Sequence, residues 1–372
     1  MSIEVREARS RRDIARFQRM PWRIYRGDPN WVPPLLSQER ALVVPGRHPF
    51  HDHALTSIFT ATDRAEVVGR IGVCLNEQHN VFRCERVGFF GFFESVNDSR
   101  VAIALAEAAR TWLRGQGVER MRGPCNWSTN ETCGLLTDGF GYPPMVMMTY
   151  NPPYYPALLE AAGFAKIKDL VAFELFTGGD DPARVSRIAD RAMQRAGITI
   201  RCMDMKRFGE DVAIVRDIYN SAWSNNWGFI PMTTREFDHL AKEVKSAIDP
   251  RLVLIAEHKG TPAAFSLSLP NLNRVLAHLN GRLFPLGFLK ALWYSRKISE
   301  ARLLTLGVKE QFRRKGIEAV LMLESLRRGR KAGYIRGEMG WVLEDNEFMI
   351  RDIEAMGGRR YKTYRIYEIP TA

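Results

Sequence analysis

The sequence predicts an α/β (α+β) protein that is built from two consecutive domains of the same fold. The chain has 372 residues, about twice the length of a common domain, and 45% of them are hydrophobic. Patterns typical of strands and helices alternate along its length. Their order is the same on both sides of a Gly-Asp-Pro run at residues 177–182. A tandem repeat explains this most simply, with domains at residues 1–178 and 179–372.

The first half contains helix patterns that end at glycines or prolines, with strand patterns between them. Helices are expected over residues 11–25, 102–114 and 154–162. Strands are expected over residues 57–62, 67–76, 87–94, 120–123 and 170–176. The helix over 102–114 has the clearest bounds, because the Asn-Asp-Ser cluster at 97–99 supplies capping side chains and two glycines follow its end.

The second half repeats this order of elements. Helices are expected within residues 183–196 and 205–223, and over 316–330 and 346–355. Strands are expected over residues 252–257, 263–269, 302–308, 335–340 and 361–369. Each half therefore ends with a short helix, a glycine and a last strand.

Composition excludes several classes of protein. No stretch of 18 apolar residues occurs, so a membrane-spanning helix is excluded, and the charged N-terminus is no secretory signal, so we expect a cytoplasmic protein. The five cysteines form no CxxC pair and are expected to be small core residues. His48, His51 and His53 have irregular spacing in a proline-rich loop, and no metal is expected. The net charge of +12 fits a polyanionic partner, but no DNA-binding motif accompanies it, so no DNA partner is expected.

The most informative segment runs from an apolar strand, 303–308, through a basic turn into a helix. Such a turn points several unpaired backbone N–H groups at one place, and the helix dipole adds partial positive charge there. Gly316 has no Cβ to hold a phosphate away from the backbone, and Arg313, Arg314 and Lys315 add full charges. The pattern indicates an anion site, although a solvated basic turn at a helix start has the same pattern.

This segment resembles the cofactor motif of the GNAT superfamily of N-acetyltransferases, Q/R-x-x-G-x-G/A, with Arg313 and Gly316 at two of its fixed positions. Glu318 stands where the family has Gly or Ala. The resemblance implies two tandem GNAT-like acyl-CoA N-acyltransferase folds, each a mixed, mostly antiparallel sheet flanked by helices. It also implies acetyl-CoA or another acyl-CoA as co-substrate, without a metal. The residues expected to hold it are Leu306, Val308, Arg313, Arg314, Lys315, Gly316, Ile317 and Asn346.

Nearly the whole chain resembles an uncharacterised bacterial group of tandem-GNAT proteins. The resemblance rests on the strand GFFGFFE at 88–94, the segment NPPYY at 151–155 and the pattern W-x-L-x-D-N at 341–346. In the first copy, the turn at 95–100 has no glycine and one basic residue, so this copy is expected not to bind CoA. We expect it to serve as a wall, an acceptor site or the surface of a homodimer.

The GNAT reaction needs a base for the amine and a proton for the departing thiolate. Glu338 is the first candidate for the base and Asp345 the second, although Glu338 can pair with Arg336 and Asp345 can cap a helix. The tyrosine that many family members use as the acid is replaced here by Ile353. Tyr364, like its neighbours on the last strand, is a candidate to substitute for it.

The acceptor is expected to be an amine, carried by a small molecule or a peptide. Asn126, Ser128 and Trp227 are candidates to line its pocket, although loop amides and hydroxyls often satisfy their own backbone. The predicted function is an acyl-CoA-dependent N-acyltransferase, most simply an N-acetyltransferase. Two alternatives stay open: a FemABX-like transferase that uses aminoacyl-tRNA, which the +12 charge fits, and a non-catalytic tandem GNAT protein, which Glu318 and Ile353 suggest.

Overall fold

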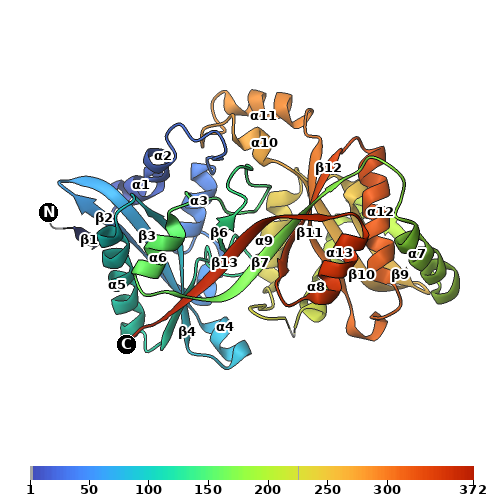
Figure 1. The fold of residues 1–372 in the computed structure, drawn as a ribbon, viewed down its shortest axis with the longest axis horizontal. Helices are drawn as coiled ribbons and strands as arrows, with labels where there is room; N and C mark the ends of the chain where they lie inside the picture. Colours follow the sequence, from blue (N-terminus) through green and yellow to red (C-terminus); the bar gives the residue numbers. More distant parts are fainter. Residues whose placement is uncertain (1–2, 225) are drawn as a thin grey trace. The chain divides into compact units, whose positions relative to one another are not determined.

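The computed structural model describes residues 3–224 and 226–372, without the side chains of residues 195 and 196. The chain folds into two compact units (Figure 1). Unit 1 comprises Met1–Leu170, Leu276–Ala291 and Lys362–Ala372, and unit 2 comprises Val171–Val275 and Leu292–Tyr361. The C-terminal segment is therefore grouped with the N-terminal residues. The sequence places the boundary between its two repeats at 178/179. The units of the structure are each made of several segments of the chain and do not test this boundary, which stays a prediction.

Helices and strands alternate as the sequence predicts. The α-helices are α1 (Arg11–Arg19), α2 (Pro21–Ile24), α3 (Leu36–Val43), α4 (Glu77–Arg83), α5 (Ser99–Gly115), α6 (Tyr155–Ala161), α7 (Ala183–Ala196), α8 (Phe208–Ala222), α9 (Thr234–Val244), α10 (Asn273–Leu276), α11 (Gly287–Ser295), α12 (Ile317–Lys331) and α13 (Glu347–Ala355). The strands are β1 (Glu4–Glu7), β2 (Ala54–Asp63), β3 (Glu66–Asn76), β4 (Val87–Ser95), β5 (Arg120–Gly123), β6 (Leu135–Asp138), β7 (Ala165–Phe176), β8 (Ile198–Cys202), β9 (Val253–His258), β10 (Thr261–Pro270), β11 (Glu300–Val308), β12 (Arg336–Leu343) and β13 (Arg359–Pro370). Short 3-10 helices are η1 (Pro49–Asp52), η2 (Met205–Arg207), η3 (Pro250–Leu252) and η4 (Glu310–Phe312).

Unit 1 is a mostly antiparallel sheet in the order β1-β2-β3-β4-β5-β13, with β6 also paired to β13. The pair β4/β5 is parallel, whereas β13 runs antiparallel to β5, with Tyr367 opposite Gly123. The helix α5 covers one face with the side chains of Val101, Leu105 and Leu113, which join the main core of this unit. Because a Cβ on Gly88 would lie 2.2 Å from Leu113 Cδ2, only glycine allows α5 to pack this closely.

Unit 2 has the strand order β7-β12-β11-β10-β9-β8, with β11/β12 parallel and β8 to β11 antiparallel. Side chains alternate along β9, so Ile255 packs with α8 and α9, whereas Leu254 packs with Leu321 of α12. The helix α7 packs beside α12 on the same core. This sheet therefore has α7 and α12 on one face and α8 and α9 on the other.

The last strand of each predicted half lies with the other unit. Residues 171–176 of β7 belong to unit 2, where β7 neighbours β12, whereas residues 362–372 belong to unit 1, where β13 pairs with β5 and β6. The predicted strands at 170–176 and 361–369 are thus present, but each completes a different core from the one that its place in the sequence suggests.

Two predicted helices are interrupted. The pattern over 11–25 is two helices, because Pro21 begins a new one and has no N–H to continue α1. The pattern over 205–223 begins with η2, and α8 follows from Phe208. Cys74, Cys125 and Cys133 are buried as expected, but the expectation is wrong for Cys84, which is exposed. Within the described residues, no helix is both long and apolar enough to cross a bilayer.

Candidate active site

The strands β11 and β12 pair over only part of their length. Their register runs from Glu300 opposite Arg336 to Leu303 opposite Met339, although β11 continues to Val308 and β12 to Leu343. The two strands therefore part after Leu303 and Met339. The residues of β11 from 303 to 306 are only half-buried, which is unusual for a strand with neighbours on both sides. The edge of β11 is open to a ligand there.

A β-bulge lies at the same place. On the other side of β11, Leu267 of β10 faces Thr305 and Ser268 faces Leu303, so Leu304 is an extra residue without a partner in this register. A bulge turns backbone groups away from the regular ladder. The backbone groups around Leu304 therefore point in other directions than in a regular strand, at the place where β11 and β12 separate.

The basic turn after β11 has two residues in the left-handed region, Arg314 (φ 62°) and Gly316 (φ 75°). Arg313 donates from Nη2 to the carbonyl oxygen of Ala222 at 2.6 Å, at the end of α8. Arg314 and Lys315 are exposed, and the Lys315 ammonium lies 5.3 Å from the centroid of the Phe312 ring. The turn therefore presents positive charge to solvent directly before α12.

Gly316 is the N-cap of α12, and no side chain caps this helix end. A Cβ on Gly316 would lie 3.2 Å from Ile188 Cγ2 and 3.3 Å from Ala192 Cβ, both on α7. The glycine is therefore needed both for its positive φ and for close packing against α7. Its predicted role in admitting a phosphate stays a prediction.

Glu318 lies in the first turn of α12. Burial raises the pKa of its carboxyl group, and the charge of Asp352 acts in the same direction. A backbone N–H and the charge of Arg313 act on this pKa in the opposite direction. The departure from the GNAT motif thus places a carboxyl group in the first turn of α12.

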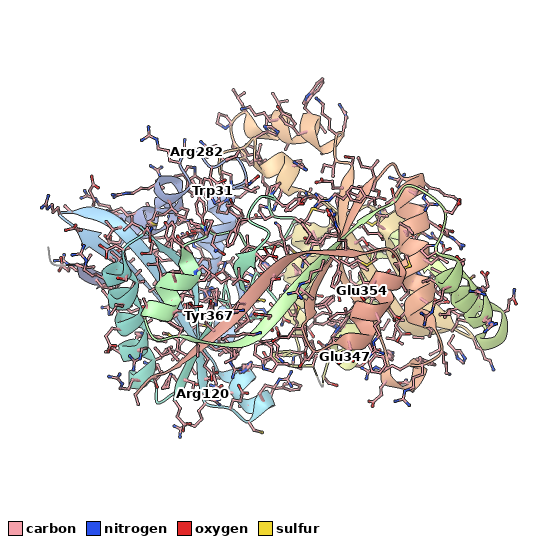
Figure 2. The ribbon with its side chains drawn as sticks, viewed as in Figure 1. Trp31, Arg120, Arg282, Glu347, Glu354 and Tyr367 are labelled. Carbon is pink, nitrogen blue, oxygen red and sulfur yellow. The ribbon has the colours of Figure 1, made fainter. Side chains whose placement is uncertain are left out.

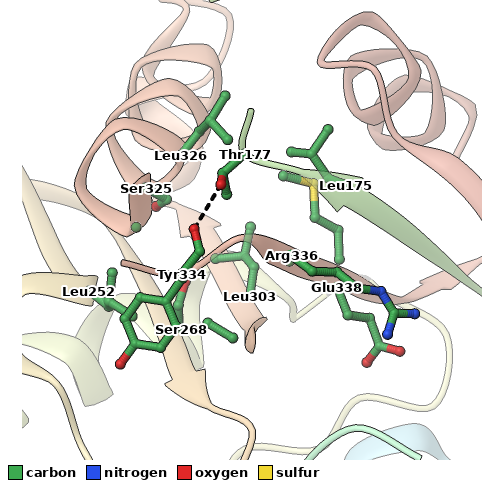
Figure 3. Close-up of a pocket in the computed structure, with 14 residues that line it drawn as sticks. Leu175, Thr177, Leu252, Ser268, Leu303, Ser325, Leu326, Tyr334, Arg336 and Glu338 are labelled. Atoms are coloured by element: carbon green, nitrogen blue, oxygen red, sulfur yellow. Dashed lines mark hydrogen bonds between the residues drawn. The ribbon is translucent and has the colours of Figure 1, made fainter. Parts of the chain in front are cut away.

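A largely apolar pocket lies between the sheet of unit 2 and α12 (Figure 3). It has a volume of about 470 Å³, which includes space open to solvent. Its lining includes Leu303 and Met339, the last residues at which β11 and β12 pair. From α12 it is lined by Leu326 and by Gly329, whose missing Cβ would meet no atom within 4 Å. The pocket thus begins where the strands part and continues under the helix.

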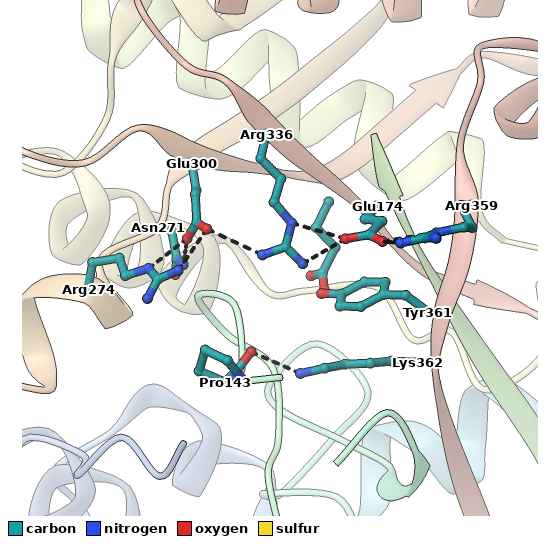
Figure 4. Close-up of polar contacts among 10 residues, drawn as sticks. Pro143, Glu174, Asn271, Arg274, Glu300, Arg336, Arg359, Tyr361 and Lys362 are labelled. Atoms are coloured by element: carbon teal, nitrogen blue, oxygen red, sulfur yellow. Dashed lines mark hydrogen bonds and ion pairs between the residues drawn. The ribbon is translucent and has the colours of Figure 1, made fainter. Parts of the chain in front are cut away.

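Charged side chains alternate with the apolar ones on the same strands and form a charged face (Figure 4), and two of these residues, Arg336 and Glu338, are also among those that line the pocket. Arg336 lies between Glu174, at 3.1 Å, and Glu300, at 3.3 Å. Arg359 also binds Glu174, and Arg274 binds Glu300. Although burial alone raises the pKa of Glu300, hydrogen bonds from Arg274 and Asn271 and the charges of Arg274 and Arg336 lower it to about 2.

Glu338 is almost completely buried on this charged face. Its Oε1 lies 3.1 Å from Nε of Arg302, and its Oε2 accepts a short hydrogen bond from the hydroxyl of Tyr361. Arg302 also donates from Nη2 to the carbonyl oxygen of Gly340 at 2.7 Å. A Cβ on Gly340 would lie 2.9 Å from that of Ala172, so glycine is required for this approach of β12 to β7. The carboxylate is thus fixed beside the point where the strands part.

The structure places the other residues predicted for the second copy, and their predicted roles stay predictions. Asn346 caps α13, because its Oδ1 accepts from the backbone N–H of Met349 at 3.2 Å. Asp345 is exposed directly before it. Ile353 is buried in the core of unit 2. Trp227 is half-buried in the loop between α8 and α9.

Three predicted site residues belong to unit 1. Asn126 accepts from the backbone N–H of Phe92 and donates to Thr132, and the hydroxyl of Ser128 accepts from the backbone N–H of residue 130. Tyr364 is fully buried and faces Leu136 across the β13/β6 pair. Unit 2 contains the basic turn, Leu306, Val308, Ile317 and Glu338, whereas these three residues belong to unit 1.

Sequence reasoning missed the ionic face of β11 and β12. Glu300 and Arg302 alternate with apolar residues on β11, as Arg336 and Glu338 do on β12. Side chains two residues apart on a strand lie on the same face of the sheet. The alternation of charged and apolar residues in two neighbouring strands is therefore the sequence pattern that could have predicted this charged face.

The fold of the chain as a whole is similar to that of solved structures. A tandem GNAT protein from the clavulanic acid biosynthesis pathway matches 100% of this chain and 99% of its own, with a TM-score of 0.60 at 13% identity. A GCN5-related N-acetyltransferase from Sphaerobacter thermophilus matches 99% of this chain and 96% of its own, with a TM-score of 0.58 at 13% identity. The fold is that of a tandem GNAT protein, which confirms the resemblance in the sequence.

Two curated proteins are similar in sequence along almost the whole chain. The bacterial ceramide synthase of Caulobacter vibrioides is 38% identical over 365 residues, which cover 96% of this chain and 94% of the synthase. Protein YghO of Escherichia coli is 36% identical over 373 residues, which cover 98% of this chain and 94% of YghO. The chain belongs to the family of these two proteins. No protein-family model matches it.

Proposed function

We propose that this protein is an N-acyltransferase that moves a long acyl chain from an acyl-CoA to the amino group of a sphingoid-type base. The observation that carries the proposal is the apolar pocket that begins where β11 and β12 part. Its lining is mostly apolar, which suits the hydrocarbon part of an acyl group. The ceramide synthase relative supports a lipid amine as acceptor. The relative, together with the apolar lining, supports a long chain rather than the acetyl group that the sequence most simply suggests.

Unit 2 offers groups that can bind the successive parts of the co-substrate. The basic turn and the uncapped N-terminus of α12 offer Arg314, Lys315 and backbone N–H groups to a pyrophosphate. The open edge of β11 offers backbone groups to the pantetheine amides. The re-aimed backbone at Leu304 lies next to the pocket, where an N–H can stabilise the negative charge that develops on the thioester oxygen.

Glu338 is our candidate for the group that receives the amine proton. It lies one residue before Met339, at the end of the paired part of β12, and Tyr361 donates to its Oε2. In the reaction, the amine nitrogen bonds to the thioester carbon, the C–S bond breaks and the thiolate leaves. The amine proton passes to the carboxylate of Glu338. Where the amine does not reach the carboxylate directly, the hydroxyl of Tyr361 relays the proton.

The test is turnover of acetyl-CoA, octanoyl-CoA and palmitoyl-CoA with sphinganine, followed by mass spectrometry of the amide product. We expect amide formation with the long acyl chains and little with acetyl-CoA. Preference for acetyl-CoA, or no amide with any of the three, would contradict the proposal.

A pocket variant makes this test sharper. Gly329→Leu places a side chain in the pocket and should lower turnover of palmitoyl-CoA by roughly tenfold or more, while octanoyl-CoA is affected less. The matched control is Gly115→Leu, because Gly115 also lies in a helix with open space at its Cβ, but in unit 1. Equal effects of the two substitutions would show that the pocket does not hold the chain.

A further inference from the structure

The segment 282–297, which contains α11, exposes large apolar side chains that no part of the described chain covers. We call this segment the α11 surface. None of the nine residues of α11 is buried. Six large hydrophobic residues of the segment are between 47% and 73% exposed. They are Phe284, Leu286, Phe288, Leu289, Leu292 and Trp293. A patch of this density on a protein surface marks an interaction site.

The start of the segment is held firmly to unit 1. The backbone N–H of Leu36 donates to the carbonyl oxygen of Gly281 at 3.0 Å, and the Trp22 indole donates to the side chain of Asn280 at 2.6 Å. A Cβ on Gly281 would lie 2.7 Å from the Trp22 ring, so the contact is close. The exposed apolar side chains therefore follow directly after residues that hydrogen bonds fix to unit 1.

The charged residues of the α11 surface and of the sequence around it have one sign. Between His258 and Ser299 the sequence has no Asp or Glu. The α11 surface itself carries four exposed basic residues, of which Arg282 is labelled in Figure 2. They are Arg282, Lys290, Arg296 and Lys297. The Lys297 ammonium lies 4.8 Å from the centroid of the Trp293 ring.

We propose that the α11 surface docks on a membrane that contains anionic lipid. Leucine, phenylalanine and tryptophan side chains on a short helix, with flanking Lys and Arg and no acidic residue, have the chemistry that enters the boundary between headgroups and acyl chains. The basic residues are attracted to anionic headgroups. An acidic protein partner would satisfy the charges but would leave most of the apolar side chains without a matching surface. The inference goes beyond the proposed function and does not depend on it.

The experiment is co-sedimentation of the full chain with vesicles of phosphatidylcholine alone and with vesicles that also contain phosphatidylglycerol. We expect binding to the anionic vesicles, with an affinity that falls as salt is added because the charge attraction is screened. The double variant Leu289→Glu/Trp293→Glu should weaken binding by tenfold or more, and Lys290→Glu/Arg296→Glu should remove most of the preference for anionic lipid.

The matched control is Val81→Glu on α4, since Val81 is 77% exposed and belongs to unit 1 away from the segment in sequence. It should bind vesicles as the unaltered protein does. All altered positions are exposed, so thermal unfolding should be unchanged and should verify that each variant is folded. Equal vesicle binding by the α11 variants and the control would overturn the proposal. Dissociation of a dimer by the α11 variants, without vesicle binding by the unaltered chain, would also overturn it and would assign the surface to a second copy.

Discussion

The carboxylate of Glu338 and the guanidinium of Arg302 form an ion pair at 3.1 Å, and neither side chain is more than 2% exposed. The two residues are direct neighbours in the register of β11 and β12. The same guanidinium binds the carbonyl oxygen of Gly340, the first residue after the last paired position on β12. One arginine therefore ties the candidate base to the place where the strands part.

Removal of this arginine should destabilise the protein strongly. Arg302→Ala leaves the Glu338 carboxylate buried without its counter-charge, and we expect a loss of about 3–5 kcal/mol in the free energy of unfolding. Urea denaturation measures it. The control is Arg359→Ala, because Arg359 also pairs with a buried glutamate but is 73% exposed, and its loss should cost about 1 kcal/mol or less. Similar values for the two variants would contradict the importance of the buried pair.

The role of Glu338 in catalysis can be separated from its role in the fold. Glu338→Gln should lower kcat by about 10²–10⁴-fold and leave the KM for acyl-CoA nearly unchanged, since it removes a proton acceptor and not a contact to the cofactor. Because the variant also leaves Arg302 without a counter-charge, kcat is measured well below its unfolding temperature. Asp345→Asn is the comparison, because Asp345 is the second candidate for the base and is exposed. A large loss in Asp345→Asn alone would transfer the role to that residue.

Much of the fold could be predicted because local patterns decide where elements begin and end. The expected helices over 316–330 and 346–355 agree closely with α12 and α13, since a glycine in the left-handed region and an asparagine cap mark their starts. The exchange of β7 and β13 could not be predicted. Both strands carry apolar residues, and which core each completes depends on contacts with β5 and β12 that are remote in sequence.

The candidate site also has one part that the sequence could predict and another part that it could not. The basic turn was visible, because a phosphate site needs glycine, positive charge and a helix start within a few residues. Arg302 and Tyr361 lie far apart in the sequence, and only the pairing of β11 with β12 and the path of β13 bring them to Glu338. The pocket is lined by residues from β7, η3, β10, β11, α12 and β12, none of which has an unusual residue of its own.

Substitution of the motif glycine should abolish binding of the co-substrate. In Gly316→Asp, the new side chain is strained at φ 75°, meets α7 and adds a negative charge where the pyrophosphate is expected. Titration calorimetry with palmitoyl-CoA should show micromolar binding to the unaltered chain and none to the variant. Gly179→Asp is the control, because Gly179 also has a positive φ but open space around it. Binding that survives in Gly316→Asp would place the co-substrate elsewhere.

The stability of unit 1 should depend on pH through Glu94. Burial raises the pKa of this carboxyl group to about 7, although Arg70 and the hydroxyls of Tyr155 and Tyr25 act in the opposite direction. Between its ordinary value of 4.5 and about 7, the folded protein keeps a proton that the unfolded chain has released. The contribution of Glu94 to stability is therefore fully present below pH 4.5 and is lost as the pH rises to about 7.

Glu94→Gln tests this, because glutamine stays neutral at every pH. Relative to the unaltered protein, the variant should gain stability as the pH rises through this range, by up to roughly 3 kcal/mol in urea denaturation. The hydrogen bonds from Tyr155 and Tyr25 can still be accepted by the amide oxygen, so the packing around residue 94 is kept. Glu107→Gln is the control, since that side chain is 54% exposed and should leave the pH dependence as it is. A pH dependence that is the same in both variants would show that Glu94 titrates near its ordinary value and that its burial is offset by Arg70.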